Sequence, residues 1–173
     1  FNGVDTAICH HPRSMNAASL RSGLAIVAAK FHFYGKAAHA GGSPEQGRSA
    51  LDAVELMNVG VNYLREHVIQ DARIHYVVEK GGNQPNIVPH YARSWYYARA
   101  PERDEVEYIF DWIVDVAKGA AIMTRTELKI EFESGLYNVI PNRTIAESIV
   151  KNMRQIGLPK YSREELKFAE EIA

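Results

Sequence analysis

Between residues 24 and 134, six segments of the chain follow the two spacings of apolar residues that distinguish strands from helices. Four have a strand pattern and two have the spacing of an amphipathic helix. The strands are predicted at 24–34, 73–79, 91–98 and 127–134, and the helices at 48–68 and 103–123. This order predicts an α+β fold, a ferredoxin-like β-α-β-β-α-β sandwich with two helices on one face of an antiparallel sheet. The other face, or an edge strand, remains available for dimerisation.

The first strand and the first helix each have one apolar side. In 24–34 His32 falls on the face opposite the apolar positions, where we interpret it as a surface histidine. In 48–68 Glu55 and Asn58 point away from the apolar stripe. The expected core positions are Val27, Ala29, Phe31, Phe33, Ala50, Ala53, Val54, Met57, Val61 and Leu64.

His39 lies among small residues at the point where the first strand passes to the first helix. Ser43, Pro44 and Gln46 have the pattern of an N-cap, a first helical residue and a capping-box partner, and the free N–H groups of such a helix start attract anions. The pattern predicts a site around His39. A tight strand–helix connection with a solvated histidine fits the same residues equally well.

A second group of candidate ligands lies near the N-terminus, in the run from Cys9 to Pro12. Cys9 and a histidine could bind zinc, but zinc usually takes four ligands and two adjacent positions do not make a site. From spacing alone, a packed cysteine beside partly exposed histidines is therefore the favoured interpretation of the run.

Charge and composition exclude some classes of partner. The 20 Lys and Arg residues balance 21 Asp and Glu residues without a long run of one sign, which argues against nucleic acid and an anionic membrane as partners. The sequence has no apolar stretch of membrane-spanning length and a single cysteine, so we expect a cytoplasmic protein. It opens without methionine and in what reads as the middle of a fold, so we expect a fragment.

Several motifs recur in the order of one known family. They are GKAAHAGGSPEQGRSALDAVELM from Gly35, GGNQPNIVPHYA from Gly81, YYARAPERDEVEYIFDWI from Tyr96, IPNRT from Ile140 and HHP from His10. The chain resembles the metallohydrolase family of aminoacylases, carboxypeptidase G and bacterial amidohydrolases, and the motifs around His39 resemble its lid, or dimerisation, domain. The resemblance covers nearly the whole chain.

The resemblance implies an arrangement of domains. Residues 1–22 would be the end of a catalytic domain and a hinge, 23–138 the lid, and 139–173 a return into the catalytic domain. The amphipathic helices predicted at 143–156 and 163–172 would then have apolar sides without a proper partner in this chain.

The resemblance also implies roles for four residues. His11 matches a metal ligand, and His39 matches a histidine that reaches the active site of the neighbouring protomer to bind substrate or stabilise an oxyanion. Asn86 and Arg99 match contacts to substrate. An asparagine in a glycine-rich loop is otherwise typical of a turn, and Arg99 could equally form a surface ion pair with a nearby acid.

A metal-dependent amidohydrolase is the activity that the resemblance implies. It would use zinc or manganese to cleave an amide bond in an aminobenzoyl-glutamate-like or N-acyl amino acid, a small carboxylate substrate. The lid would form a homodimer, and a second subunit of the hydrolase would be a further partner. We expect the isolated chain to be inactive and to bind no metal stably. The alternative is a stand-alone ferredoxin-like module that binds a small carboxylate or dimerises without catalysis.

Overall fold

The chain consists of two compact units. The computed structural model describes residues 2–8, 10–12 and 14–173, so Cys9 lies outside the described residues. One unit is Ser22–Ile140, and the other combines Phe1–Arg21 with Pro141–Ala173. Each unit is considered by itself below.

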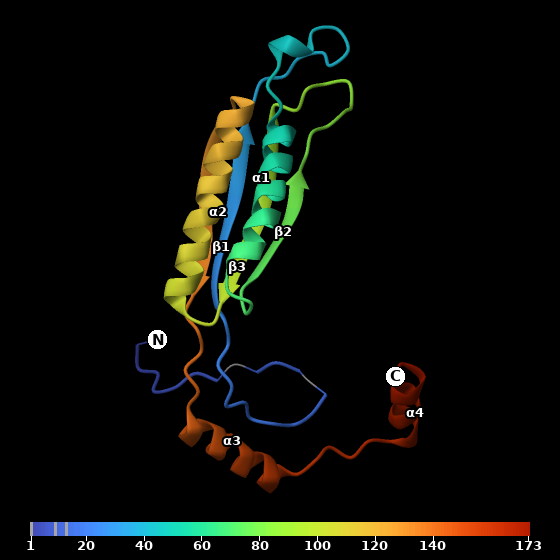
Figure 1. The fold of residues 1–173 in the computed structure, drawn as a ribbon. Coiled ribbons are helices and arrows are strands. Elements are labelled where there is room, and N and C mark those ends of the chain that lie inside the picture. Colours follow the sequence, from blue (N-terminus) through green and yellow to red (C-terminus); the bar gives the residue numbers. More distant parts are fainter. Residues whose placement is uncertain (1, 9, 13) are drawn as a thin grey trace. The chain divides into compact units, whose positions relative to one another are not determined.

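The unit Ser22–Ile140 is a two-layer sandwich of one sheet and two helices (Figure 1). The strand order β2-β3-β1-β4 and the antiparallel pairing of every neighbouring pair confirm the predicted ferredoxin-like fold. Both helices cover the same face of the sheet (Figure 1). The elements are β1 (Ala25–Tyr34), α1 (Ala50–Leu64), β2 (Arg73–Lys80), β3 (Tyr91–Ala100), α2 (Arg103–Thr124) and β4 (Glu127–Leu136), with short 3-10 helices at Pro44–Gln46 and Arg65–His67.

The core lies between the sheet and the helices, at the positions that the apolar pattern predicted. Phe31 is fully buried and packs edge-on against Tyr96 of β3, with 5.5 Å between the ring centroids. All of the expected core positions of the first strand and first helix are buried. The two helices approach closely at Gly60, where a Cβ atom would lie 2.6 Å from Cγ1 of Val116.

The first helix lies close to its predicted range, 48–68, but its N-cap is not the residue that the sequence predicted. Pro44–Gln46 forms only a single 3-10 turn, and the Ser43 side chain makes no capping bond. The extended backbone of Gly47 separates this turn from α1, whose N-cap is Ser49, with Oγ accepting a bond from the Asp52 N–H at 3.1 Å. The prediction of an anion-attracting helix start at Ser43 is therefore wrong.

Two polar residues predicted at the surface are buried. His32 is only 7% exposed, with its ring nitrogens 3.0 Å from the Tyr91 hydroxyl and 3.0 Å from the Glu131 carboxylate. Asn58 is 9% exposed and accepts a bond from the Tyr96 hydroxyl. Burial raises the pKa of Tyr96, so this hydroxyl remains a donor at neutral pH. Both predictions failed because each side chain has a partner far away in the sequence.

The second unit contains two helices, α3 (Arg143–Ile156) and α4 (Arg163–Glu171), close to the predicted ranges. Ala146 is the buried residue of α3, and the apolar residues Leu166 and Phe168 of α4 are exposed. A shallow groove of about 400 Å³ follows one side of α3, lined by Ala18, Leu20, Ala146, Glu147, Val150, Lys151 and Arg154. Among the described residues, no helix has the length and apolar character needed to cross a membrane.

Candidate functional site

Two loops meet at the end of the sheet where β1 finishes and β3 begins. We call residues 35–49 and 81–90 the distal loops. Lys36 and Arg48 exchange two backbone hydrogen bonds of 2.9 Å within the first loop, and the Val88 N–H donates to the Ala38 carbonyl between the loops at 2.9 Å. The distal loops therefore form a small ladder that continues beyond the sheet.

His39 lies in this ladder with one ring nitrogen already used. Its Nδ1 accepts hydrogen bonds from the backbone N–H groups of Gly41 and Gly42, at 3.2 and 2.9 Å. An accepting Nδ1 carries no proton, so in the neutral ring the proton is on Nε2. Because the side chain is exposed, this Nε2–H can donate to an oxygen atom of a ligand.

Two glycines make this arrangement possible. A Cβ atom on Gly42 would lie 3.3 Å from Nδ1 of His39, so a larger residue would crowd the ring. A Cβ atom on Gly35 would lie 2.0 Å from the backbone oxygen of Arg48, a contact that no side chain can make. Glycine at position 35 is required for the first loop to close at the end of β1.

Asn86 lies beside His39 in the same ladder. His39 and Ile87 form a backbone bridge, and the Asn86 carbonyl accepts a bond from the Ala40 N–H at 2.9 Å. The side chain of Asn86 is exposed. The structure thus brings two of the candidate residues together, from loops more than forty residues apart in the sequence.

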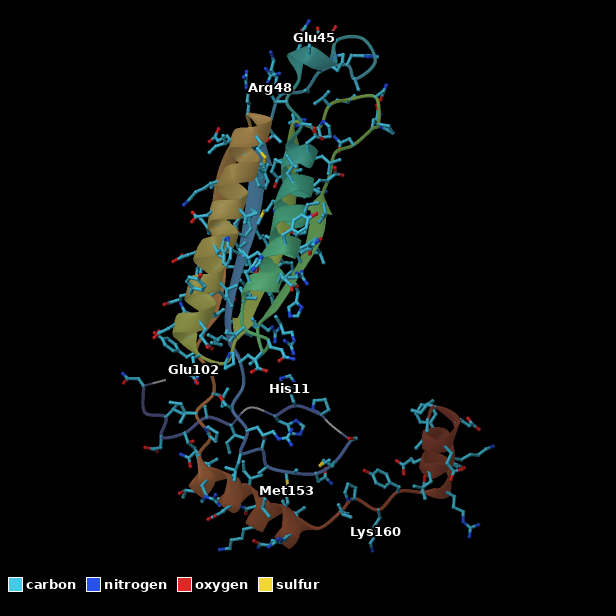
Figure 2. All side chains as sticks on the ribbon, viewed as in Figure 1. His11, Glu45, Arg48, Glu102, Met153 and Lys160 are labelled. Carbon is cyan, nitrogen blue, oxygen red and sulfur yellow. The ribbon has the colours of Figure 1, made fainter. Side chains whose placement is uncertain are left out.

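Arg99 lies at the other end of the sheet. It is the ninth residue of β3, whereas the distal loops adjoin the first residue of that strand. Figure 2 labels Arg48 and Glu102 at opposite ends of the sandwich, and Arg99 is three residues from Glu102. Within one chain, Arg99 therefore does not join His39 and Asn86.

The ion pair considered as an alternative for Arg99 does not form among the described residues. Arg99 lies over the ring of Tyr97, 5.8 Å from its centroid, and Glu102 instead accepts a bond from the Asn138 amide at 3.0 Å. A role for Arg99 in binding a carboxylate stays a prediction.

Sequence reasoning did not single out two residues that share a face of the sheet with Arg99. Arg73 of β2 is the direct cross-strand partner of Arg99, and His75 is the partner of Tyr97. Direct partners in antiparallel strands have side chains on the same face. The alternation of Arg73 and His75 in the sequence hints at a common face, but only the register places them beside Arg99.

His11 belongs to the other unit and is exposed. No group of three or more His, Cys, Asp or Glu side chains that could hold a metal ion occurs among the described residues. Catalytic zinc usually takes three protein ligands, so His11 does not form a metal centre with the other described residues. Its role as a metal ligand stays a prediction.

Comparison with known families identifies the sandwich. Residues 24–124 match the peptidase dimerisation domain. The match takes in β1, α1, β2, β3 and α2, which is more than half of the chain. The chain belongs to this family. Its dimerisation domain carries both distal loops and the strand that holds Arg99.

Curated relatives of this dimerisation-domain chain are hydrolases. One subunit of the p-aminobenzoyl-glutamate hydrolase of Escherichia coli (strain K12) is 41% identical over 173 residues, which cover 99% of this chain and 36% of the relative. Xaa-Arg dipeptidase of Mus musculus is 35% identical over 159 residues, which cover 91% of this chain and 37% of the relative. The chain therefore spans little more than a third of the length of these relatives.

Solved structures share the fold of the dimerisation domain. An aminobenzoyl-glutamate utilization protein from Klebsiella pneumoniae aligns with a TM-score of 0.64 at 24% identity, over 78% of this chain and 34% of that chain. A hydantoinase/carbamoylase family amidase from Burkholderia ambifaria aligns with a TM-score of 0.66 at 15% identity, over 81% and 35%. At these identities the structures establish the common fold.

Proposed function

We propose that this chain is the lid portion of an amide-cleaving metallohydrolase and forms a homodimer through the edge of its sheet. The observation that carries the proposal is the separation of the site residues, with His39 and Asn86 at one end of the sandwich and Arg99 at the other. Residues so far apart in one chain act on the same substrate only if two copies supply them.

The edge strand β2 is the surface that we propose for the dimer. It forms one border of the sheet, and Val77 and Val78 near its middle are 54% and 47% exposed. An unpaired strand edge with exposed apolar side chains is a ready template for another strand. The opposite border, β4, also exposes an apolar side chain, Phe132, but there the charged residues Glu131 and Glu133 flank it on both sides and discourage such pairing.

Two-fold pairing of β2 with a second β2 assembles the proposed site. Two identical strands related by a two-fold axis run antiparallel, so the distal loops of one copy lie next to the opposite end of the other copy's sheet. His39 and Asn86 of one copy then approach Arg99 of the second copy. Each dimer has two such sites.

The chemistry that we propose for the lid is binding and charge stabilisation. The Nε2–H of His39 donates to the amide oxygen of the substrate and stabilises the charge that develops there during cleavage. Asn86 holds the substrate beside it, and Arg99 pairs with a substrate carboxylate through its planar guanidinium. Closure of the lid excludes water from the site.

A divalent metal, zinc or manganese, is part of the proposal for the longer protein. When bound, it would polarise the amide carbonyl and activate a water molecule. We propose His11 as one of its ligands, but the described residues do not supply a full ligand set. No step of the lid's chemistry is therefore derived through the metal.

For the substrate we propose an aminobenzoyl-glutamate-like or related N-acyl amino acid. The names of the two curated relatives support an acylated amino acid but differ in its side chain, one naming glutamate and the other arginine. A second subunit of the hydrolase is a further proposed partner, because a different subunit of the Escherichia coli hydrolase is 33% identical over 92 residues of this chain. A cytoplasmic location stays a prediction.

Replacement of Val77 by lysine tests the dimer. Val77 is near the middle of β2, so in a two-fold pairing the two substituted lysines face each other and repel, and we expect the dissociation constant to rise about 100-fold. Phe132→Lys is the matched control, since it adds the same charge near the middle of the other edge strand at a side chain that is 59% exposed.

Sedimentation equilibrium measures both variants against the unchanged chain. The proposal requires that Val77→Lys weakens the dimer and that Phe132→Lys leaves it unchanged. If Phe132→Lys alone weakens the dimer, the interface is at β4, and a monomeric unchanged chain argues against dimerisation through this domain.

Hydrolysis assays test the activity. The longer protein with zinc or manganese is expected to hydrolyse p-aminobenzoyl-glutamate, whereas the 173-residue chain with the same metals is expected to show no enzyme-like rate. A longer protein that binds N-acyl amino acids without cleaving any of them favours the alternative, a carboxylate-binding or dimerisation module without catalysis.

A further inference from the structure

Three basic side chains gather on the face of the sheet that the helices leave uncovered. Arg73 and Arg99 are direct cross-strand partners, and His75 lies two residues further along β2. Arg99 is half-buried, and its Nε atom is buried without a hydrogen-bond partner among the described residues. We call Arg73, His75 and Arg99 the basic cluster.

The guanidinium of Arg73 is held in place at this border of the sheet. Its Nη1 donates to the carbonyl oxygens of Gln70 and Ala72, at 2.6 and 2.7 Å. These two bonds use one nitrogen. Its other nitrogens make no hydrogen bond within the described part of the chain, so they can serve a ligand.

The basic cluster has no acidic partner within the described residues. The ion pairs found there include neither Arg73 nor Arg99. Elsewhere on the same face Arg93 lies 2.9 Å from Glu79, and Lys30 lies 3.8 Å from Glu133. Arg73 and Arg99 therefore differ from Arg93 and Lys30, which each have an acidic partner on this face.

The environment of His75 reflects the same excess of positive charge. Partial burial, followed by the charges of Arg99, Arg65 and Arg73, lowers the pKa of His75. Like charges directly opposite each other across two strands also destabilise a sheet. Residues that lower the stability of a protein in this way are typical of sites that bind a ligand.

We propose that the basic cluster binds both carboxylates of an acylated dicarboxylic amino acid, with Arg99 taking one carboxylate and Arg73 with His75 taking the other. One guanidinium matches one carboxylate in a bidentate pair, so two opposed guanidinium groups accommodate two carboxylates. A ligand with a cationic side chain would be repelled. As a statement about the substrate, this inference rests on the proposed function, and it selects an acidic over a basic amino acid.

The test is a titration of the ¹⁵N-labelled 173-residue chain with three probes of similar size. They are N-acetylglutamate, N-acetylglutamine and N-acetylarginine, which carry two, one and one carboxylates, the last with an added cation. We expect N-acetylglutamate to bind about tenfold more tightly than N-acetylglutamine, as one charge-assisted hydrogen-bonded pair contributes. Its shifts should concentrate in 73–75 and 97–99.

The variants Arg73→Gln and His75→Gln test whether these two residues bind the second carboxylate, the one that Arg99 does not take. Either substitution should reduce the affinity for N-acetylglutamate toward that for N-acetylglutamine, while the N-acetylglutamine affinity stays unchanged because Arg99 is intact. Arg93→Gln is the matched control, because this arginine is on the same strand face but is already paired with Glu79. It should leave all three affinities unchanged.

The proposal is overturned if N-acetylglutamate binds no more tightly than N-acetylglutamine, if N-acetylarginine binds best, or if the shifts fall outside the β2–β3 end. A variant that does not fold is recognised by its amide spectrum, and the remaining variant then decides. These titrations need neither metal nor turnover. A longer protein without hydrolase activity would contradict the proposed function and still leave the dicarboxylate site to be judged by binding.

Discussion

Replacement of His39 by alanine is expected to lower the turnover number of the proposed longer hydrolase by about 10²–10³-fold, the usual cost of removing one donor to an oxyanion. The two backbone bonds to Nδ1 leave the proton on Nε2, so alanine removes the donor that we propose for the substrate oxygen. The exposed side chain contributes little to the core, and the free energy of unfolding should change by less than about 0.5 kcal/mol.

Steady-state kinetics of the metal-loaded enzyme and thermal unfolding measure the two effects. His90→Ala is the matched control, because His90 is an exposed histidine in the other distal loop. Among the described residues its side chain makes no hydrogen bond, and its backbone carbonyl accepts one from the Gly35 N–H at 2.8 Å. This control should retain full turnover. Unchanged turnover in a well-folded His39→Ala variant would remove His39 from the mechanism.

Replacement of Phe31 by alanine is expected to have the largest effect on stability. The ring is fully buried at the centre of β1 and contacts Tyr96 edge-on, with Phe110 of α2 at 6.2 Å between centroids. Removing a buried phenylalanine typically lowers the free energy of unfolding by about 3–5 kcal/mol, because apolar contacts are lost and a cavity remains. That loss approaches the total stability of many domains of this size.

Urea unfolding of the chain, followed by far-ultraviolet circular dichroism, measures this change. Phe132→Ala serves as the control, since Phe132 has the same side chain on the edge strand β4 but is 59% exposed. We expect the control to cost less than about 1 kcal/mol. Equal costs for the two variants would show that Phe31 is not the packing centre of this core.

The order of elements and the buried faces were accessible from the sequence because they depend on local spacing. Apolar residues at two-residue spacing in β1 and at helical spacing in α1 face the same core. This spacing is visible in each segment without knowledge of the distant residues that it contacts. The N-cap of α1 was predicted wrongly because Ser43 and Ser49 both have side chains that can cap a helix. The extended backbone at Gly47 decides in favour of Ser49.

His32 and Asn58 show what local patterns cannot reveal. His32 is buried because Tyr91 and Glu131, 59 and 99 residues away, supply its hydrogen bonds. Asn58 faces the Tyr96 hydroxyl, 38 residues away. A polar residue is satisfied inside a protein only when its partners are present, and no spacing rule in a single sequence identifies those partners.

The candidate site was predicted in part. His39 and Asn86 were singled out separately, and the ladder between the distal loops places them side by side. Arg99 lies far from His39 and Asn86 because it is the ninth residue of β3, whereas the distal loops adjoin the first residue of that strand. The basic cluster was missed because Arg73 and Arg99 are neighbours only through the pairing of β2 with β3. The register of that pairing is not visible in the sequence.

The backbone ladder between the distal loops also determines how His39 can move. Because each loop is bonded to the other, and β1 and β3 continue directly into them, the histidine is carried at the tip of a stiff arm. A ten-residue strand is about 30 Å long, so a rotation of about 10° at the base of such an arm displaces its tip by about 5 Å. In the proposed lid, a slight turn at the base would therefore bring His39 into hydrogen-bonding range of the substrate or withdraw it.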